Sequence, residues 1–190
     1  MTKNPWLPEA PLPTEPTTVA VVATTGATAP QPAVTPPEAG DQLRTFATTT
    51  QAGLWVVGTH GGAGESTVAQ LLAGNETGHR WPDTSPAPAV LLTARTHAAG
   101  LRAAQTAMRA WAAGQTPHIR LLGLVLVADA PGKLPRTLAV RAEILNGGVP
   151  HTWLLPWVDE YRIDVDPADP PRQVRKVLNE ITTVLSNSTI

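Results

Sequence analysis

The sequence contains no cysteine and has few aromatic or charged residues. Among its 190 residues are one Phe, one Tyr and six Trp, and 15% of the residues are charged. The absence of cysteine excludes disulfides, thiolate catalysis, and zinc or iron–sulfur sites built on Cys ligands. It also means that cysteine usage gives no information about the cellular compartment.

Neither sign of charge dominates the chain. Lys and Arg number 14 and Asp and Glu number 15, for a formal net charge of −1. We therefore expect no nucleic-acid partner, and the basic cluster at residues 172–176 is short. No apolar run approaches the roughly 18 residues of a membrane span, and the N-terminus has no apolar h-region. These features predict a cytoplasmic protein without a membrane span.

Proline is concentrated in the first part of the chain. Residues 1–50 hold nine of the 20 prolines and show neither helical nor strand periodicity. Such a segment buries too little apolar surface to offset its conformational entropy, which predicts a disordered Pro/Thr/Ala-rich tail before a domain at residues 51–190. A second interpretation is that residues 4–8, Asn-Pro-Trp-Leu-Pro, dock on a partner, because an aromatic residue between prolines loses little entropy on binding.

After residue 50, strand and helix patterns alternate. Short apolar runs predict strands at residues 54–57, 89–93, 121–127 and 151–156. Apolar residues at helical spacing predict helices at residues 65–73, 97–113, 135–145 and 172–186. This alternation predicts an α/β fold with a small, doubly wound, mainly parallel sheet of about four or five strands flanked by helices. Ligands of such a sheet bind beyond the carboxyl ends of the strands.

A glycine-rich loop joins the first predicted strand to the first predicted helix. The segment 57–67 reads Val-Gly-Thr-His-Gly-Gly-Ala-Gly-Glu-Ser-Thr. Glycines between a strand and a helix let successive backbone amides surround a phosphate, and a following Ser or Thr holds magnesium. The usual lysine is missing, however, because Glu65 stands in its place.

This segment resembles the deviant Walker A loop of ParA/MinD-type ATPases, whose pattern is Lys-Gly-Gly-x-Gly-Lys-Ser/Thr-Thr. The resemblance makes the fold P-loop NTPase-like and covers about 130 residues, of which only the loop is specific. His60 and Glu65 replace the two family lysines, and the family's Asp-containing strand is absent or reduced. The matching positions are His60, Gly61, Gly62, Gly64, Glu65, Ser66 and Thr67. The loop is also similar to that of a group of actinobacterial and mobile-element proteins without an established activity.

The missing lysines define the expected function. The resemblance implies a catalytically impaired P-loop domain, a pseudo-ATPase with no catalytic residue and no cofactor, acting as a binding or assembly module with a protein partner or as a homodimer. The alternative is an atypical nucleotide- or phosphate-binding protein that uses ATP and Mg²⁺ with a substitute basic residue. Charges about 4 Å apart interact by roughly 4 kcal/mol at an effective dielectric of 20, so replacing Lys by Glu opposes triphosphate binding.

Three residues at other predicted strand ends are candidate accessories. In one interpretation, Arg95 or Lys133 supplies the missing positive charge. In a second, one of these residues pairs with Glu65, and the carboxylate fills the phosphate position. In a third, Glu65 points to solvent. Asp129 follows an apolar run as a Walker B carboxylate does, or begins a turn before Pro-Gly. His60 and His97 each follow a strand and can approach one another, but their spacing does not favour zinc, and we expect no metal site.

Overall fold

Five parallel strands form the central sheet, in the order β3-β2-β5-β6-β7. The computed structural model describes residues 26–51, 53–162 and 169–188. The strands of the central sheet are β2 (Trp55–Gly58), β3 (Asn75–Glu76), β5 (Ala89–Arg95), β6 (Arg120–Val127) and β7 (Thr152–Leu155). Four of these five strands are those that the apolar runs predict. The predicted α/β fold with a doubly wound parallel sheet is therefore confirmed.

Four α-helices alternate with these strands in the described part of the chain. They are α1 (Glu65–Leu71), α2 (Ala98–Ala112), α3 (Arg136–Asn146) and α4 (Arg172–Asn187). Each coincides with a predicted helix to within a few residues. Helix α4 has the clearest apolar stripe, and its Val174, Ile181 and Val184 are buried.

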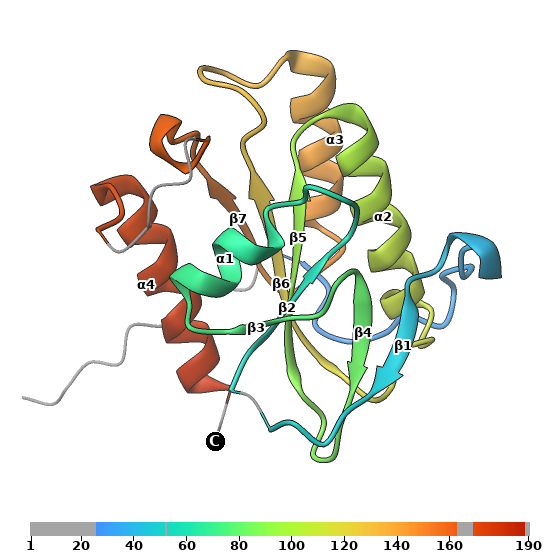
Figure 1. Cartoon of the computed structure of the whole chain (residues 1–190). Coiled ribbons are helices and arrows are strands. Elements are labelled where there is room, and N and C mark those ends of the chain that lie inside the picture. Colours follow the sequence, from blue (N-terminus) through green and yellow to red (C-terminus); the bar gives the residue numbers. More distant parts are fainter. Residues whose placement is uncertain (1–25, 52, 163–168, 189–190) are drawn as a thin grey trace, which may run out of the picture.

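The helices cover both faces of the sheet, as Figure 1 shows. Helices α1 and α4 pack on one face, where Val68 and Ile181 join a buried cluster with Val125. Helices α2 and α3 pack on the other face, where Leu101 and Leu145 join a second cluster. Side chains that alternate along β5 and β6 contribute to both clusters, which explains why these strands are apolar throughout. The carboxyl ends of β2, β5 and β6 consequently meet at one edge of the sheet.

A second, smaller sheet was not predicted. Strand β1 (Arg44–Ala47) pairs in parallel with β4 (Arg80–Asp83). Both strands are four residues long, and each has polar residues on its exposed side, so neither has the apolar run that identifies the central strands. The Phe46 ring of β1 lies edge-on to Trp55, with ring centroids 5.9 Å apart, and the Arg80 guanidinium lies 4.6 Å from the Phe46 ring centroid.

The described part of the proline-rich segment differs from the sequence expectation. Residues 1–25, including the candidate docking peptide at residues 4–8, lie outside the described residues. Residues 26–50, expected to be disordered, instead pack on the domain, because Val34, Leu43 and Phe46 are partly buried against the core. A single aromatic or aliphatic side chain every few residues gives no periodicity, yet it suffices to hold an extended segment in place.

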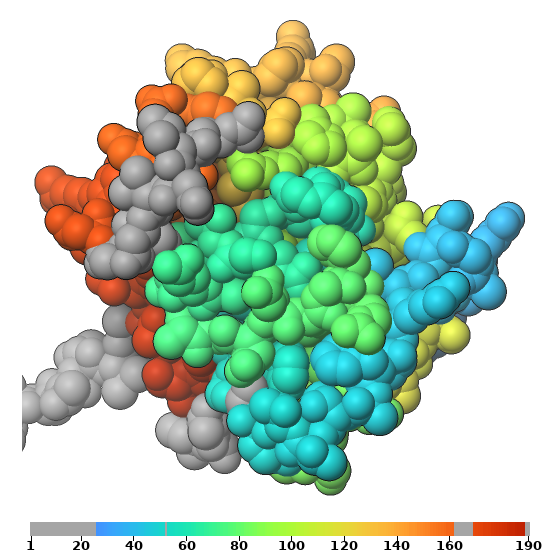
Figure 2. Space-filling view, viewed as in Figure 1, coloured from blue at the N-terminus to red at the C-terminus, as the bar shows by residue number. Residues whose placement is uncertain are grey.

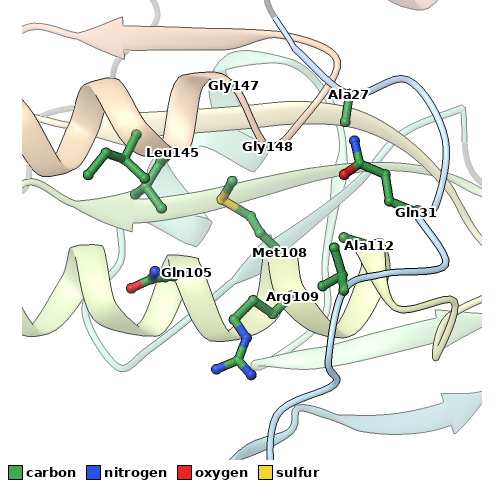
Figure 3. A pocket seen from close by; sticks show the side chains of 11 residues that line it. Ala27, Gln31, Gln105, Met108, Arg109, Ala112, Leu145, Gly147 and Gly148 are labelled. Carbon is green, nitrogen blue, oxygen red and sulfur yellow. The ribbon is translucent and has the colours of Figure 1, made fainter.

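This segment crosses the ends of α2 and α3 (Figure 3). The amide of Ala27 donates to the Gly147 carbonyl at 3.1 Å, and the amide of Gln31 donates to the Ala112 carbonyl at 2.7 Å. Between the segment and the helices lies a cavity of about 180 Å³, into which Met108 reaches toward Gly148. The boundary of the folded unit therefore lies before residue 50.

Among the helices of the described residues, none combines the length and the apolar character that crossing a membrane requires.

Candidate functional site

The glycine-rich loop stands at the carboxyl edge of the central sheet. Residues 59–64 leave β2, turn, and enter α1, whose N-cap is Gly64. Gly64 has φ +85°, a left-handed conformation that favours glycine, and the Val127 side chain lies 3.1 Å from where its Cβ would stand. Figure 2 shows α1 and the neighbouring loop at the surface of this face of the molecule. A strand, a glycine turn and a helix are thus arranged as the motif predicts.

The Glu65 side chain turns away from solvent at the start of α1. Only 6% of Glu65 is exposed. Its Oε1 accepts the amide of Thr77 at 2.6 Å, the Thr77 hydroxyl at 3.0 Å and the amide of Gly78 at 2.9 Å. Its Oε2 lies 3.3 Å from Nδ1 of His79. The carboxylate is therefore held by the turn that follows β3, through three hydrogen bonds and one histidine contact.

The prediction that Glu65 makes an intramolecular contact is confirmed, but the predicted partners are wrong, and the carboxylate does not fill the phosphate position over Gly61 and Gly62. Neither Arg95 nor Lys133 pairs with it, because β3 and not β5 or β6 supplies the neighbouring turn. The carboxylate also lies beside Gly58, with Oε2 2.6 Å from where a Cβ would stand. Apart from the adjacent residues, no heavy atom of the described part of the chain lies within 4 Å of the corresponding positions at Gly61 and Gly62. Glu65 thus binds the turn beside β2 and leaves the space around these two glycines open.

Arg95 ties the loop to the neighbouring strand ends. Its Nε donates to the Gly62 carbonyl at 3.2 Å, and its Nη1 donates to the Ala128 carbonyl at 2.9 Å. The guanidinium therefore lies against the loop and brings a positive charge to it. In this respect the sequence prediction placed Arg95 correctly.

The two histidines of the site lie together, as expected from the strand ends. The rings of His60 and His97 have centroids 5.2 Å apart. Nε2 of His60 accepts the amide of Arg95 at 3.1 Å, so in the neutral ring Nδ1 carries the proton and lies 2.8 Å from the Gly61 carbonyl. Burial lowers the pKa of His60 below 6.5; the Gly61 hydrogen bond opposes this, and the nearby His97, His79 and Arg95 add to the lowering.

The two hydroxyl residues of the loop have separate surroundings. The Ser66 hydroxyl donates to Oε2 of Glu76 at 2.6 Å. Thr67 lines a cavity of about 20 Å³ together with Arg95 and Tyr161. The hydroxyl of Tyr161 is buried and has no hydrogen-bond partner among the described residues. A volume of this size is enough for one water molecule.

Asp129 and Lys133 lie outside the loop itself. Both line a cavity of about 260 Å³ between the end of β6 and the start of α3. The amide of Asp129 donates to the Thr96 hydroxyl at 3.0 Å, which fixes the backbone after β6. No group of three or more His, Asp or Glu residues placed to hold a metal ion occurs in the part of the chain that the structure describes.

Sequence reasoning missed the residues that hold Glu65. The sequence alone indicates no role for Thr77, Gly78 or His79. Gly78 and His79 have φ of +62° and +60°, so the turn is left-handed at both positions. The Thr-Gly-His sequence signals a turn. The two-residue strand before it is too short to reveal that this turn lies beside the glycine-rich loop.

Comparison with known proteins identifies one family. Residues 52–178 match DUF6668, a family of unknown function, and because the match covers more than half of the chain, the chain belongs to this family. No curated protein and no solved structure matches the chain.

Proposed function

We propose that this member of the DUF6668 family is a P-loop-like binding or assembly module without ATPase activity. The observation that carries the proposal is the buried Glu65 carboxylate, which accepts three hydrogen bonds from the 77–78 turn and which the resemblance aligns with the phosphate-binding lysine. A lysine at this position would attract a triphosphate. A carboxylate beside the loop disfavours a triphosphate instead, by an amount that falls as the distance between the charges grows.

The carboxylate cannot move aside without cost. Its removal would leave the buried amide of Thr77 without its acceptor, and a buried unpaired amide costs about 1–3 kcal/mol. A bound nucleotide would therefore face the repulsion if the carboxylate stayed in place, or the loss of this hydrogen bond if it moved aside. Because phosphoryl transfer depends on positive charge around the transferred group, we expect no hydrolysis.

The loop also keeps its shape without a ligand. The amide of Thr59 donates to the Thr93 carbonyl at 2.9 Å, and the amide of Ala63 donates to the His60 carbonyl at 3.2 Å. The Ser66 hydroxyl, which would approach magnesium in an active loop, donates to Glu76 instead. These contacts support a preformed scaffold that needs neither nucleotide nor metal.

A module of this kind acts through its surface, with a protein partner or a second copy of the chain. Helix α3 offers a suitable outward face, because Val140 is 50% exposed and Ile144 is 63% exposed one turn further along. Exposed apolar side chains that are adjacent mark interaction surfaces more often than isolated ones do.

One observation favours the second candidate, a phosphate-dependent protein using ATP and Mg²⁺. The Arg95 guanidinium donates to the carbonyl of Gly62 and so brings a positive charge to the loop from the end of β5. Arginine binds phosphate well through its planar set of donors. If Arg95 replaced the lysine, nucleotide binding would depend on this residue.

Calorimetric titration of the full chain separates the two candidates. ATP, GTP, ADP and pyrophosphate are titrated with and without magnesium into the wild type and into Arg95→Met and Ser66→Ala variants. The module predicts no saturable heat with any of them. Saturable binding that is lost in Arg95→Met would establish the second candidate, and magnesium-dependent turnover lost in Ser66→Ala would refute the module.

Self-association is tested separately by sedimentation equilibrium. If a second copy is the partner, the wild type associates with rising concentration and Ile144→Asp weakens that association. The matched control is Thr182→Asp, which introduces the same charge at an exposed position of α4. If the wild type remains monomeric at all concentrations, the partner is not a second copy of the chain but a different protein.

A further inference from the structure

A cavity of about 260 Å³ opens beside the glycine-rich loop, at the carboxyl ends of β5 and β6. Its walls come from the segment after β6, the start of α3, and β7. Leu134, Leu138 and Leu154 provide aliphatic surface, and Leu154 is 57% exposed although it belongs to a strand of the central sheet. The carboxyl edge of a parallel sheet is where ligands of α/β folds bind. The cavity is smaller than the roughly 300–1,000 Å³ of sites for drug-sized molecules, so it suits a small metabolite.

Two opposite charges line this cavity without pairing. Lys133 and Asp129 are both exposed, and neither side chain makes an ion pair or a hydrogen bond with any described residue. The backbone of Asp129 is nevertheless fixed, because its amide donates to the Thr96 hydroxyl, which is buried. The cavity thus presents one ammonium and one carboxylate that a ligand can engage.

His97 adds a hydrogen-bond donor to the same cavity. Its Nδ1 accepts the amide of Gly100 at 2.9 Å, which caps α2 and places the proton of the neutral ring on Nε2. Nε2 has no hydrogen-bond partner among the described residues. A ligand carboxylate can therefore meet two donors, the Lys133 ammonium and the His97 ring.

We propose that this cavity binds a small zwitterion with an apolar side chain, of the chemical class of the aliphatic amino acids. The ligand's carboxylate pairs with Lys133 and His97, its ammonium pairs with Asp129, and its side chain covers Leu134, Leu138 and Leu154. A simple anion would face the Asp129 carboxylate, and an uncharged apolar molecule would take both charges out of water unpaired. The zwitterion matches both charges and the aliphatic wall. This site is independent of the state of Glu65, so it stands whether or not the loop binds nucleotide.

The test follows the backbone amides of the full chain by NMR during titration with three related probes. L-leucine carries both charges, 4-methylpentanoate lacks the ammonium, and isopentylamine lacks the carboxylate. We expect leucine to bind with a dissociation constant of about 1 mM, given its few heavy atoms, and to shift the amides of residues 96–97 and 128–134. Each single-charge probe should bind at least about threefold more weakly than leucine.

Charge-removing variants identify which group each residue contacts. Lys133→Gln should weaken leucine and 4-methylpentanoate about threefold and should not weaken isopentylamine, because the ammonium of that probe gains nothing from a lysine. Asp129→Asn should weaken leucine and isopentylamine and should not weaken 4-methylpentanoate, whose carboxylate gains nothing from an aspartate. Lys176→Gln removes the same charge from an exposed position of α4 and should change none of the three.

Three results would overturn the proposal: shifts that do not saturate, shifts that map elsewhere, or probes whose affinities do not depend on Lys133 and Asp129. A further variant, Leu154→Glu, changes an exposed side chain and should abolish leucine binding without unfolding the chain. Undiminished binding in that variant would also overturn it. Calorimetry with nucleotides tests the loop separately, because a positive result there leaves the expectations for leucine unchanged.

Discussion

The carboxylate of Glu65, the first residue of α1, accepts the backbone amide of Thr77 at 2.6 Å, twelve residues later in the chain. The bond fixes the turn that follows β3, a strand of only two residues at the edge of the central sheet. Short edge strands gain little from their own backbone pairing. Glu65 therefore stabilises the β3 edge from the helix that precedes it.

Substitution of Glu65 should destabilise the protein in a graded way. Glu65→Gln keeps the volume and one acceptor oxygen, so we expect a loss of about 1–2 kcal/mol in the free energy of unfolding. Glu65→Lys places an ammonium against the amides of Thr77 and Gly78 in a buried position, with an expected loss of about 3 kcal/mol or more. Urea denaturation followed by Trp fluorescence measures both.

The same variants also test the proposed function. Glu65→Lys introduces a lysine of the kind that binds phosphate in an active P-loop, so under the proposed function it should gain affinity for pyrophosphate even as stability falls. The control is Glu180→Lys, the same reversal at a partly exposed position of α4. If Glu65→Lys were as stable as the wild type, the hydrogen bonds to the 77–78 turn would contribute nothing to stability.

Removal of the Arg95 side chain should loosen the glycine-rich loop. Arg95→Met keeps most of the aliphatic stem but loses the hydrogen bonds to the carbonyls of Gly62 and Ala128. Each bond contributes about 1 kcal/mol, so we expect amide hydrogen exchange in residues 61–64 to accelerate about tenfold. Arg102→Met changes an exposed arginine of α2 and should leave this exchange unchanged. Equal exchange in the two variants would show that the loop is held without Arg95.

The sequence predicted the central fold well because the central strands are buried on both faces. Runs such as residues 121–127 are apolar throughout, and the helices between them carry clear stripes. The order of the strands was not predictable from these runs, because each could neighbour any other. This order decides that the turn after β3, and not Arg95 or Lys133, contacts Glu65.

The remaining errors have the same physical origin, which is that contacts between distant segments leave little local signal. Strand β1 is one example, since only Phe46 of its four residues packs on the core. The His60–His97 contact was predictable only because both residues end strands of one parallel sheet. The glycine at position 78 indicates a turn, but the sequence does not show which distant residues contact that turn in the fold.

Truncation of Phe46 should test whether the proline-rich segment contributes to folding. Phe46 packs edge-on against Trp55 and under the Arg80 guanidinium. Because the ring is only partly buried, Phe46→Ala should cost about 2 kcal/mol, less than a fully buried Phe. Thr45→Ala at the neighbouring exposed position is the control. An unchanged melting temperature for Phe46→Ala would indicate that residues 26–50 are a dispensable tail.

Acid should weaken the protein through His60. Burial lowers the pKa of this ring in the folded state below its ordinary value of 6.5. As the pH falls below 6.5, His60 therefore binds a proton more readily in the unfolded chain than in the folded protein. The contribution of neutral His60 to stability is therefore complete above about pH 6.5 and falls as the pH decreases through the lowered pKa. Protonation would also remove the acceptor that Nε2 offers to the amide of Arg95.

The measurement is the free energy of unfolding of the wild type and of His60→Gln between about pH 7.5 and 5. Glutamine keeps an acceptor for the Arg95 amide but does not titrate in this range, so the variant should lose less stability toward acid than the wild type. An NMR titration of the His60 ring in the folded protein gives its pKa directly. A ring that titrates at or above 6.5, or two proteins with the same pH dependence, would contradict the prediction. In that case the His60–Arg95 contact would not depend on the neutral ring.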